Sequence, residues 1–223
     1  MTNVITFSGW GQKYNALDNI APNARHINYN CHDDIDNLFD SIDGSNCDIL
    51  IGWSLGGQLA LRAVENGTIK TSLIVLLSTP FQFVKANDFN CGIDANDYYN
   101  FKKQFISNPE KTLQKFSFLI ANGDKNAKKI VIELQNNKDI IDASNWLYWL
   151  NELKSFSCKT MNYSNMPKTL AIIGSSDQII NTNQIDLFKP LIKNYTTNIF
   201  NNCGHAPHLH NCAKVIQLIK DAA

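Results

Sequence analysis

No stretch of this 223-residue sequence stays apolar over the roughly 20 residues that a membrane-spanning helix requires. An excess of one charge is missing too, because 20 basic residues balance 20 acidic ones. We therefore expect neither a membrane segment nor a nucleic-acid partner. The first residues lack the basic start and apolar stretch of a signal peptide. A cytoplasmic protein that acts as a monomer is the resulting expectation.

Clustered cysteines are also missing, since no two of the six form a C-x-x-C pair. A disulfide framework belongs to shorter secreted chains, and zinc sites need tighter spacing, so we expect reduced thiols and no metal or organic cofactor. His205, His208 and His210 leave a metal site open as an alternative, although their spacing is unusual and no carboxylate is near. The six cysteines are Cys31, Cys47, Cys91, Cys158, Cys203 and Cys212.

The sequence does contain many short apolar runs, within a composition that is 44% hydrophobic and 18% charged. Their continuous, β-branched character is typical of strands buried on both faces of a parallel sheet. Helices are predicted between them, at 33–41 and 55–65. The alternation predicts an α/β fold with a doubly wound, mostly parallel sheet of about six strands. The expected strands are Val4–Phe7, His26–Tyr29, Ile49–Gly52, Ser72–Leu77, Thr169–Gly174 and Thr197–Phe200.

The strand pattern stops between residues 81 and 163, where aromatics and lysines are frequent. Three or four helices are predicted there, and the α/β rhythm resumes at Pro167. A segment that leaves a sheet and returns to it usually covers the strand ends. We therefore divide the chain into a core of residues 1–80 and 164–223 and a helical cap of residues 81–163.

A G-x-S-x-G motif, Gly52-Trp-Ser54-Leu-Gly56, lies between a predicted strand and a predicted helix. That context predicts a sharp turn that exposes Ser54 as a nucleophile, with glycines where side chains would collide. The amide of Leu55, at the helix N-terminus, would then face a developing oxyanion. The alternative is an ordinary strand–turn–helix with an incidental serine.

A base and an acid follow in the order that such a nucleophile requires. His205 lies in the loop after the last predicted strand, and Asp177 lies just past the strand before it. Asp177 would orient the His205 imidazole, which would activate Ser54. The amide of Trp10, after the first strand, is the candidate for the second oxyanion donor. A surface-loop histidine and a helix-capping aspartate are the alternatives.

Four motifs together resemble the α/β-hydrolase superfamily, and within it the pimeloyl-[acyl-carrier protein] methyl ester esterases of biotin synthesis. The resemblance implies the α/β-hydrolase fold and a serine carboxylesterase that acts on the methyl ester of pimeloyl-acyl-carrier protein. The motifs are Gly9-Trp10-Gly11, Gly52-Trp-Ser54-Leu-Gly-Gly, Gly174-x-x-Asp177 and Gly204-His205-Ala-Pro207.

The same resemblance assigns further residues. It implies that the amides of Trp10 and Leu55 form the oxyanion hole, and that basic cap residues bind the acidic acyl-carrier protein at Lys111, Lys115 and Lys128. The residues implied to contact the acyl chain are Trp10, Phe116, Ser117, Phe118, Leu119 and Ile120.

Charge within the cap supports a docking surface independently. Residues 102–129 contain seven lysines and two acidic residues, a net charge of +5 in a neutral chain. Lys111 and Lys115 are four positions apart and share a face if the segment is helical. Such a face suits an acidic partner, although it could equally keep the cap solvated.

Two other functions stay open at this point. A general carboxylesterase or a carbon–carbon bond hydrolase of the same fold would use the same three residues. A ligand-binding receptor on a hydrolase scaffold, with little catalysis, is the alternative from another class.

Overall fold

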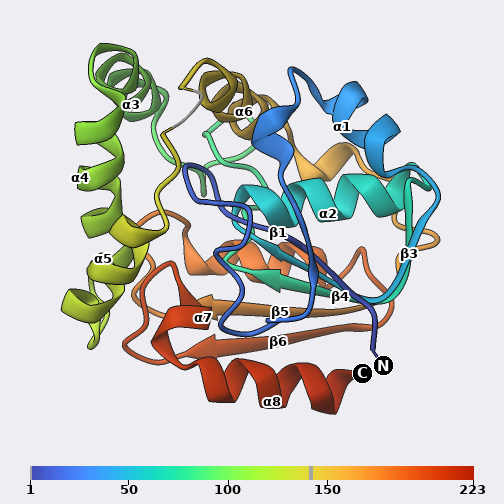
Figure 1. Ribbon diagram of the computed structural model, residues 1–223. Helices are drawn as coiled ribbons and strands as arrows, with labels where there is room; N and C mark the ends of the chain where they lie inside the picture. Colours follow the sequence, from blue (N-terminus) through green and yellow to red (C-terminus); the bar gives the residue numbers. More distant parts are fainter. Residues whose placement is uncertain (1, 141–142) are drawn as a thin grey trace.

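The centre of the computed structural model, which describes residues 2–140 and 143–223, is a six-stranded parallel sheet (Figure 1). The strand order is β2-β1-β3-β4-β5-β6, with every neighbouring pair parallel. This confirms the predicted doubly wound α/β fold. The strands are β1 (Val4–Phe7), β2 (Arg25–Ile27), β3 (Ser45–Trp53), β4 (Ile69–Leu77), β5 (Lys168–Gly174) and β6 (Tyr195–Phe200).

Helices cover both faces of the sheet. In Figure 1, α1 (Ile35–Ile42) and α2 (Leu55–Glu65) lie over one face, and α8 (Cys212–Ala222) lies over the other. Eight of the eleven residues of α2 are buried, and the exposed Glu65 ends the helix, so its first turns pack into the protein on all sides. A 3-10 helix, η3 (Thr182–Phe188), follows β5, and the short helix α7 (Pro207–His210) precedes α8.

Two predicted boundaries are wrong at the start of the chain. The strand expected to reach Tyr29 ends at Ile27, and Tyr29 begins the 3-10 helix η1 (Tyr29–Cys31). The Tyr29 hydroxyl donates to the Ser8 carbonyl at 3.1 Å, and its ring packs edge-to-face on two tryptophans of the cap. Burial of the Tyr29 ring against the tryptophans is more stabilising than two further residues of strand pairing at the edge of the sheet would be. The helix after η1 begins at Ile35, not at residue 33, because Asp34 caps it.

The described part of the segment 81–163, residues 81–140 and 143–163, contains four α-helices and no strand of the sheet. In Figure 1 these helices lie beside the carboxyl edge of the sheet, where the arrowheads of β4 to β6 point. Within the described residues, no helix has the length and apolar character needed to cross a membrane. The helices are α3 (Ala95–Ser107), α4 (Pro109–Ala121), α5 (Ala127–Asn136) and α6 (Ala143–Ser155), followed by the 3-10 helix η2 (Cys158–Thr160).

Candidate active site

Ser54 occupies the tight turn between β3 and α2. Its backbone has φ of 55° and ψ of −119°, a conformation that residues with side chains rarely adopt. The turn also needs two glycines: a Cβ on Gly52 would lie 2.5 Å from the Gly56 carbonyl oxygen, and one on Gly56 would lie 2.3 Å from that of Phe7. The Ser54 amide donates to the Leu77 carbonyl at 2.8 Å, which fixes the turn against β4.

Ser54, His205 and Asp177 form one chain of hydrogen bonds. Ser54 Oγ lies 2.9 Å from His205 Nε2, and His205 Nδ1 lies 2.7 Å from Asp177 Oδ2. The side chains of His205 and Asp177 are 1% and 0% exposed. Asp177 and His205 are 28 positions apart in the sequence, and Ser54 and His205 are 151 positions apart. The structure thus brings distant residues together. Buried contacts of this kind are strong, since water does not compete for them.

The Asp177 carboxylate is held so that one oxygen faces the histidine. Its Oδ1 accepts from the amides of Ile179 and Ile180, both at 2.9 Å, and its Oδ2 faces His205. Because a carboxylate oxygen accepts, the proton of the neutral imidazole is placed on Nδ1. Nε2 is then the acceptor that faces the Ser54 hydroxyl.

The backbone of His205 is fixed on two sides as well. Its amide donates to the Ile120 carbonyl in α4 at 2.9 Å, and its carbonyl accepts from Trp53 Nε1 at 2.9 Å. One contact comes from the cap and the other from β3. The position of the imidazole therefore depends on both parts of the chain.

The two amides expected to donate to an oxyanion, those of Leu55 and Trp10, make no hydrogen bond among the described residues. Leu55 is the first residue of α2, so its amide has no acceptor within the helix. The Trp10 amide has no hydrogen-bond acceptor among residues 2–140 and 143–223. The Trp10 indole Nε1 donates to the Trp146 carbonyl at 2.7 Å, which anchors the loop after β1 to the cap.

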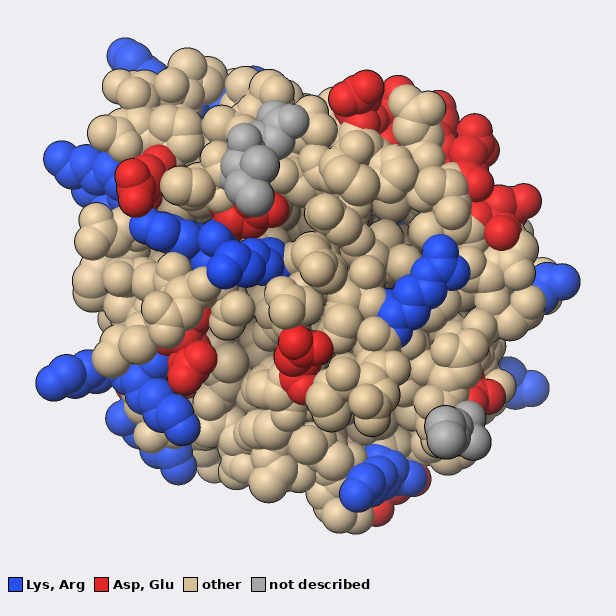
Figure 2. Space-filling view, viewed as in Figure 1, with Lys and Arg blue, Asp and Glu red and all other residues tan. Residues whose placement is uncertain are grey.

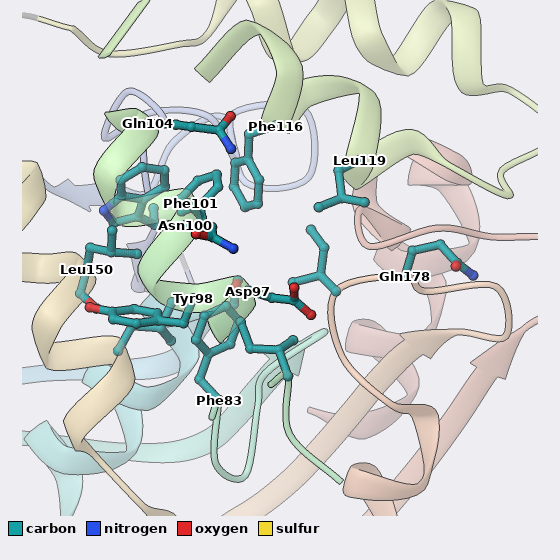
Figure 3. Close-up of a pocket in the computed structure, with 15 residues that line it drawn as sticks. Phe83, Asp97, Tyr98, Asn100, Phe101, Gln104, Phe116, Leu119, Leu150 and Gln178 are labelled. Atoms are coloured by element: carbon teal, nitrogen blue, oxygen red, sulfur yellow. The ribbon is translucent and has the colours of Figure 1, made fainter. Parts of the chain in front are cut away.

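Ser54 and Trp10 line a cavity of about 480 Å³ between the sheet edge and the cap. Figure 3 shows the wall of this cavity, where Tyr98 and Phe116 are labelled. Its walls are mostly aromatic and aliphatic, and its size suits a small acyl ligand. Burial raises the pKa of the wall residue Tyr98 to about 12, so its phenol stays neutral. Asp97 is the charged residue of the lining. The other lining residues are Phe83, Ile93, Asn100, Phe101, Gln104, Phe116, Leu119, Leu150, Leu153, Gln178 and Ile179.

The family profile of the alpha/beta hydrolase fold matches residues 28–211, which is most of the chain. The chain belongs to the alpha/beta hydrolase fold family. Among solved structures, this hydrolase is similar to an esterase from Exiguobacterium antarcticum, with a TM-score of 0.83 and 14% identity over 99% of this chain and 91% of that one. A bromoperoxidase from Bacillus anthracis superposes with a TM-score of 0.76, also at 14% identity, over 99% and 91% of the two chains. Both likenesses concern the fold.

Sequence relatives confirm the resemblance to the pimeloyl esterases. The pimeloyl-[acyl-carrier protein] methyl ester esterase of Pseudoalteromonas atlantica is 26% identical over 165 residues, 72% of this chain and 64% of the relative. That of Wigglesworthia glossinidia brevipalpis is 28% identical over 196 residues, 77% and 68%. The biotin biosynthesis bifunctional protein BioHC of Teredinibacter turnerae is 25% identical over 182 residues, 76% and 32%. The hydrolase thus spans from about a third to about two thirds of these curated relatives.

Of the five α4 residues expected in the acyl channel, Phe116 and Leu119 line the cavity. The structure does not bring the other three to its wall. Ser117 Oγ donates to the Leu113 carbonyl within the helix, the Phe118 side chain is 56% exposed, and Ile120 is buried. An α-helix presents residues i and i+3 to one side, so a run of five cannot line one cavity.

Sequence reasoning missed the contributions of α3 and α6 to the cavity. Tyr98 and Phe101 come from α3, and Leu150 and Leu153 from α6. Their spacing of three positions does indicate apolar helix faces. The pattern could not show whether each face meets a cavity or a neighbouring helix.

The three cap lysines lie apart from the cavity, on the outer surface. Lys111 and Lys115 on α4 and Lys128 on α5 are exposed, and none forms an ion pair with another described residue. Figure 2 shows basic side chains gathered on the side of the molecule where α3, α4 and α5 lie. The surface is therefore open to a partner.

The three histidines considered as a metal site have separate surroundings. His205 contacts Asp177, and His210 Nδ1 lies 2.9 Å from Asp124 Oδ2. The His208 ring packs edge-to-face on Trp53, with centroids 4.5 Å apart. The three rings therefore do not converge on one site.

Proposed function

We propose that this hydrolase is a serine carboxylesterase that cleaves the methyl ester of pimeloyl-acyl-carrier protein in biotin biosynthesis. The observation that carries the proposal is the hydrogen-bonded chain of Ser54, His205 and Asp177 facing an apolar cavity. The relatives that bear this activity in their names support the choice of substrate.

In the first step, His205 Nε2 accepts the Ser54 proton while Ser54 Oγ attacks the ester carbonyl. The negative charge that develops on the carbonyl oxygen is stabilised by the amides of Trp10 and Leu55. Asp177 stabilises the imidazolium. The intermediate then collapses, and methanol leaves with the proton from His205.

In the second step, water attacks the acyl-enzyme. His205 Nε2 accepts a proton from the water as its oxygen bonds to the acyl carbon. Collapse of the second intermediate returns the proton to Ser54 Oγ and releases the free carboxylic acid. Both steps use the same acceptor and the same two amides.

The cavity and the cap would supply substrate binding. Phe116 and Leu119 would contact the methylene chain, and Lys111, Lys115 and Lys128 would bind the acidic carrier. Binding energy from the carrier, far from the ester, would position the ester carbonyl at Ser54. A monomer in the cytoplasm is part of the same proposal, and the six unpaired cysteines agree with a reducing compartment.

The replacement Ser54→Ala tests the nucleophile. We expect an unchanged fold, turnover reduced on the order of 10⁶-fold, and no labelling by a fluorophosphonate probe. The wild-type protein should be labelled stoichiometrically. Retained turnover or labelling in Ser54→Ala would exclude Ser54 as the nucleophile, and an unlabelled wild-type protein would favour a ligand-binding receptor.

A comparison of substrates tests the physiological ester. We expect a much higher kcat/KM with the methyl ester of pimeloyl-acyl-carrier protein than with the same ester lacking the carrier or with short nitrophenyl esters. The gene should also restore biotin-independent growth to a strain that lacks the methyl esterase. Equal rates with and without the carrier would favour a general carboxylesterase, and cleavage of carbon–carbon bonds would favour the other hydrolase class.

A further inference from the structure

A second buried carboxylate–imidazole pair lies beside the first. Asp124 Oδ2 is 2.9 Å from His210 Nδ1, and the two side chains are 0% and 5% exposed. The same oxygen accepts from the Gly204 amide at 3.0 Å, and Asp124 Oδ1 accepts from the Asn126 amide at 2.7 Å. Gly204 directly precedes His205, so this carboxylate is bonded to the backbone next to the candidate base.

Asp124 belongs to a short cap segment, residues 120–126, that holds the whole loop around His205. The Ile120 carbonyl accepts from the His205 amide at 2.9 Å, and the Lys125 amide donates to the Asn202 carbonyl at 3.1 Å. The approach is close, because a Cβ on Gly204 would lie 2.6 Å from the Ile120 carbonyl oxygen. The bond from the Gly204 amide to Asp124 involves a side chain, so substitution can remove it. A second side-chain bond of this segment, from Asn126 Nδ2 to the His210 carbonyl at 3.2 Å, lies farther along the chain from His205.

A buried carboxylate strongly favours the geometry that satisfies it. Without hydrogen bonds such a group would be costly to bury, and bonds from N–H donors to a charged acceptor are about twice as strong as neutral ones. A shift of the His205 loop would lengthen the bond from Gly204 to Asp124. Asp124 thus resists displacement of the loop more than a neutral contact would.

Asp124, Cys203 and His210 also offer ligand atoms within 4.8 Å of one another, the arrangement of a possible metal site. Both Asp124 oxygens, however, already accept from N–H groups. Burial, with smaller contributions from the carboxylates of Asp124 and Asp177, raises the pKa of the Cys203 thiol, whereas a metal ligand must be a thiolate. The cluster therefore fits a hydrogen-bonded pair better than a metal ion.

We propose that Asp124, supported by His210, is a positioning residue that holds the His205 imidazole within reach of Ser54. The inference rests on the proposed role of His205 as the base. Asp124 contacts neither the cavity nor the reacting atoms, and it acts through the Gly204 amide. The cap thereby contributes to the catalytic geometry and not only to substrate binding.

The experiment compares Asp124→Asn and Asp124→Leu with the wild-type protein, using a short nitrophenyl ester and a fluorophosphonate probe. We expect kcat and the labelling rate to fall together on the order of 10- to 100-fold, with KM little changed, because misplacement of a catalytic group lowers the chemical step. Asp124→Asn keeps the shape and one acceptor oxygen, so it should lose less than Asp124→Leu.

Asp18→Asn is the matched control. Asp18 Oδ1 lies 2.7 Å from His26 Nε2, so this variant also removes a carboxylate–imidazole contact, but one at the β2 edge of the sheet. We expect its kcat and labelling rate to equal those of the wild-type protein. Urea unfolding of each variant identifies the conditions in which the variant is folded, and the activities are compared under those conditions.

Asp124 variants that unfold more easily but, when folded, keep the wild-type kcat and labelling rate would overturn the proposal. If neither Asp124 variant folds, His210→Gln provides the test, because it removes one donor and leaves the Gly204 bond. A fall in kcat at constant KM, smaller than the fall expected for the Asp124 variants, would support the proposal. An unchanged kcat would overturn it.

Failure of the proposed function gives a different result. If the wild-type protein is neither labelled nor active, the His205 role fails, while NMR of the His205 ring proton can still show whether Asp124 holds the loop. Faster exchange of the Nδ1 proton with solvent in Asp124→Asn than in Asp18→Asn would support positioning, and equal exchange would contradict it.

Discussion

His208 has a ring that could form two hydrogen bonds, and among the described residues neither nitrogen has a partner. The side chain is 1% exposed and packs against Trp53. Burial, and to a smaller extent the neighbouring His205 ring, lowers the pKa of His208 from 6.5 to about 3. His208 thus packs as an aromatic ring, and its imidazole stays neutral over the physiological range.

The burial of His208 predicts that the folded protein loses stability in acid. Well above pH 6.5 the ring is neutral in both the folded and unfolded states, so it gives no pH dependence there. Below pH 6.5 the unfolded chain binds a proton that the folded protein excludes down to about pH 3, so stability falls with pH. Between pH 7 and pH 5, we expect the free energy of unfolding to fall by about 2 kcal/mol less in His208→Phe than in the wild-type protein.

Urea unfolding at pH 7 and pH 5 measures this difference. Other groups also titrate in this range, but their contribution is common to both proteins and cancels in the comparison. Equal losses of stability in the wild-type protein and His208→Phe would contradict a neutral buried His208.

The strand–turn–helix of β3 and α2 is the element on which the candidate site is built. Its turn brings α2 so close to the end of β1 that a Cβ on Gly56 would meet two backbone carbonyls, those of Phe7 and Ser8, at 2.3 and 2.5 Å. Backbone atoms cannot move aside as a flexible side chain can. Close packing of backbone atoms therefore requires the glycine spacing of the motif, apart from any catalytic role.

Gly56→Ala should consequently reduce both stability and activity. We expect a loss of about 1–3 kcal/mol in the free energy of unfolding, as for other overpacked sites. Because α2 would move away from β1, Ser54 and the Leu55 amide would be displaced, and kcat should fall on the order of 10- to 100-fold. Urea unfolding and ester hydrolysis measure the two effects.

Gly67→Ala is the control for this substitution. Gly67 has φ of 84° at the end of α2, and a Cβ there would meet no atom within 4 Å. The variant should lose about 1 kcal/mol from backbone strain alone and keep its kcat. If Gly56→Ala behaved like Gly67→Ala, close packing at the turn would not be what requires the glycine.

Across the whole molecule, charge of opposite sign collects at different places. The basic side chains of the cap lie over α3, α4 and α5, while acidic side chains gather at the corner near α1 (Figure 2). Residues 33–43 contain five aspartates and no lysine or arginine. A neutral protein can therefore attract an acidic partner to one side and repel it from another.

Reversal of the cap charges, with Lys111→Glu, Lys115→Glu and Lys128→Glu combined, should weaken the use of a carrier-linked substrate. Each exposed ion pair contributes about 0.2–1 kcal/mol, so we expect KM to rise on the order of 10-fold. The effect should shrink at high salt, and KM for a nitrophenyl ester should not change.

Three lysines at the opposite edge of the sheet provide a control with the same change in net charge. Lys70, Lys168 and Lys193 are exposed near the starts of β4, β5 and β6. Their combined replacement by glutamate should leave KM for the carrier-linked substrate unchanged. An equal rise in KM for both triple variants would mean that net charge, not the cap surface, attracts the carrier.

Local patterns were sufficient to predict the sheet, because buried parallel strands and the turn around Ser54 depend on neighbours in the sequence. The start of α2 at Leu55 was predicted correctly, and Ser54, Asp177 and His205 could be selected from motif and order. Local pattern predicts a strand through Tyr29, but the position of this side chain depends on two tryptophans more than a hundred positions away.

The sequence by itself determined the alternation of strands and helices, the glycines that a sharp turn needs, and which polar residues follow the ends of the strands. Only the tertiary structure decided that Phe116 faces the cavity while Phe118 faces solvent, and that Asp124 meets His210 across 86 positions. The physical reason is the separation along the sequence over which each kind of interaction acts. Backbone sterics and strand burial act between near neighbours, whereas a cavity wall or a buried hydrogen-bonded pair exists only after distant segments have packed together.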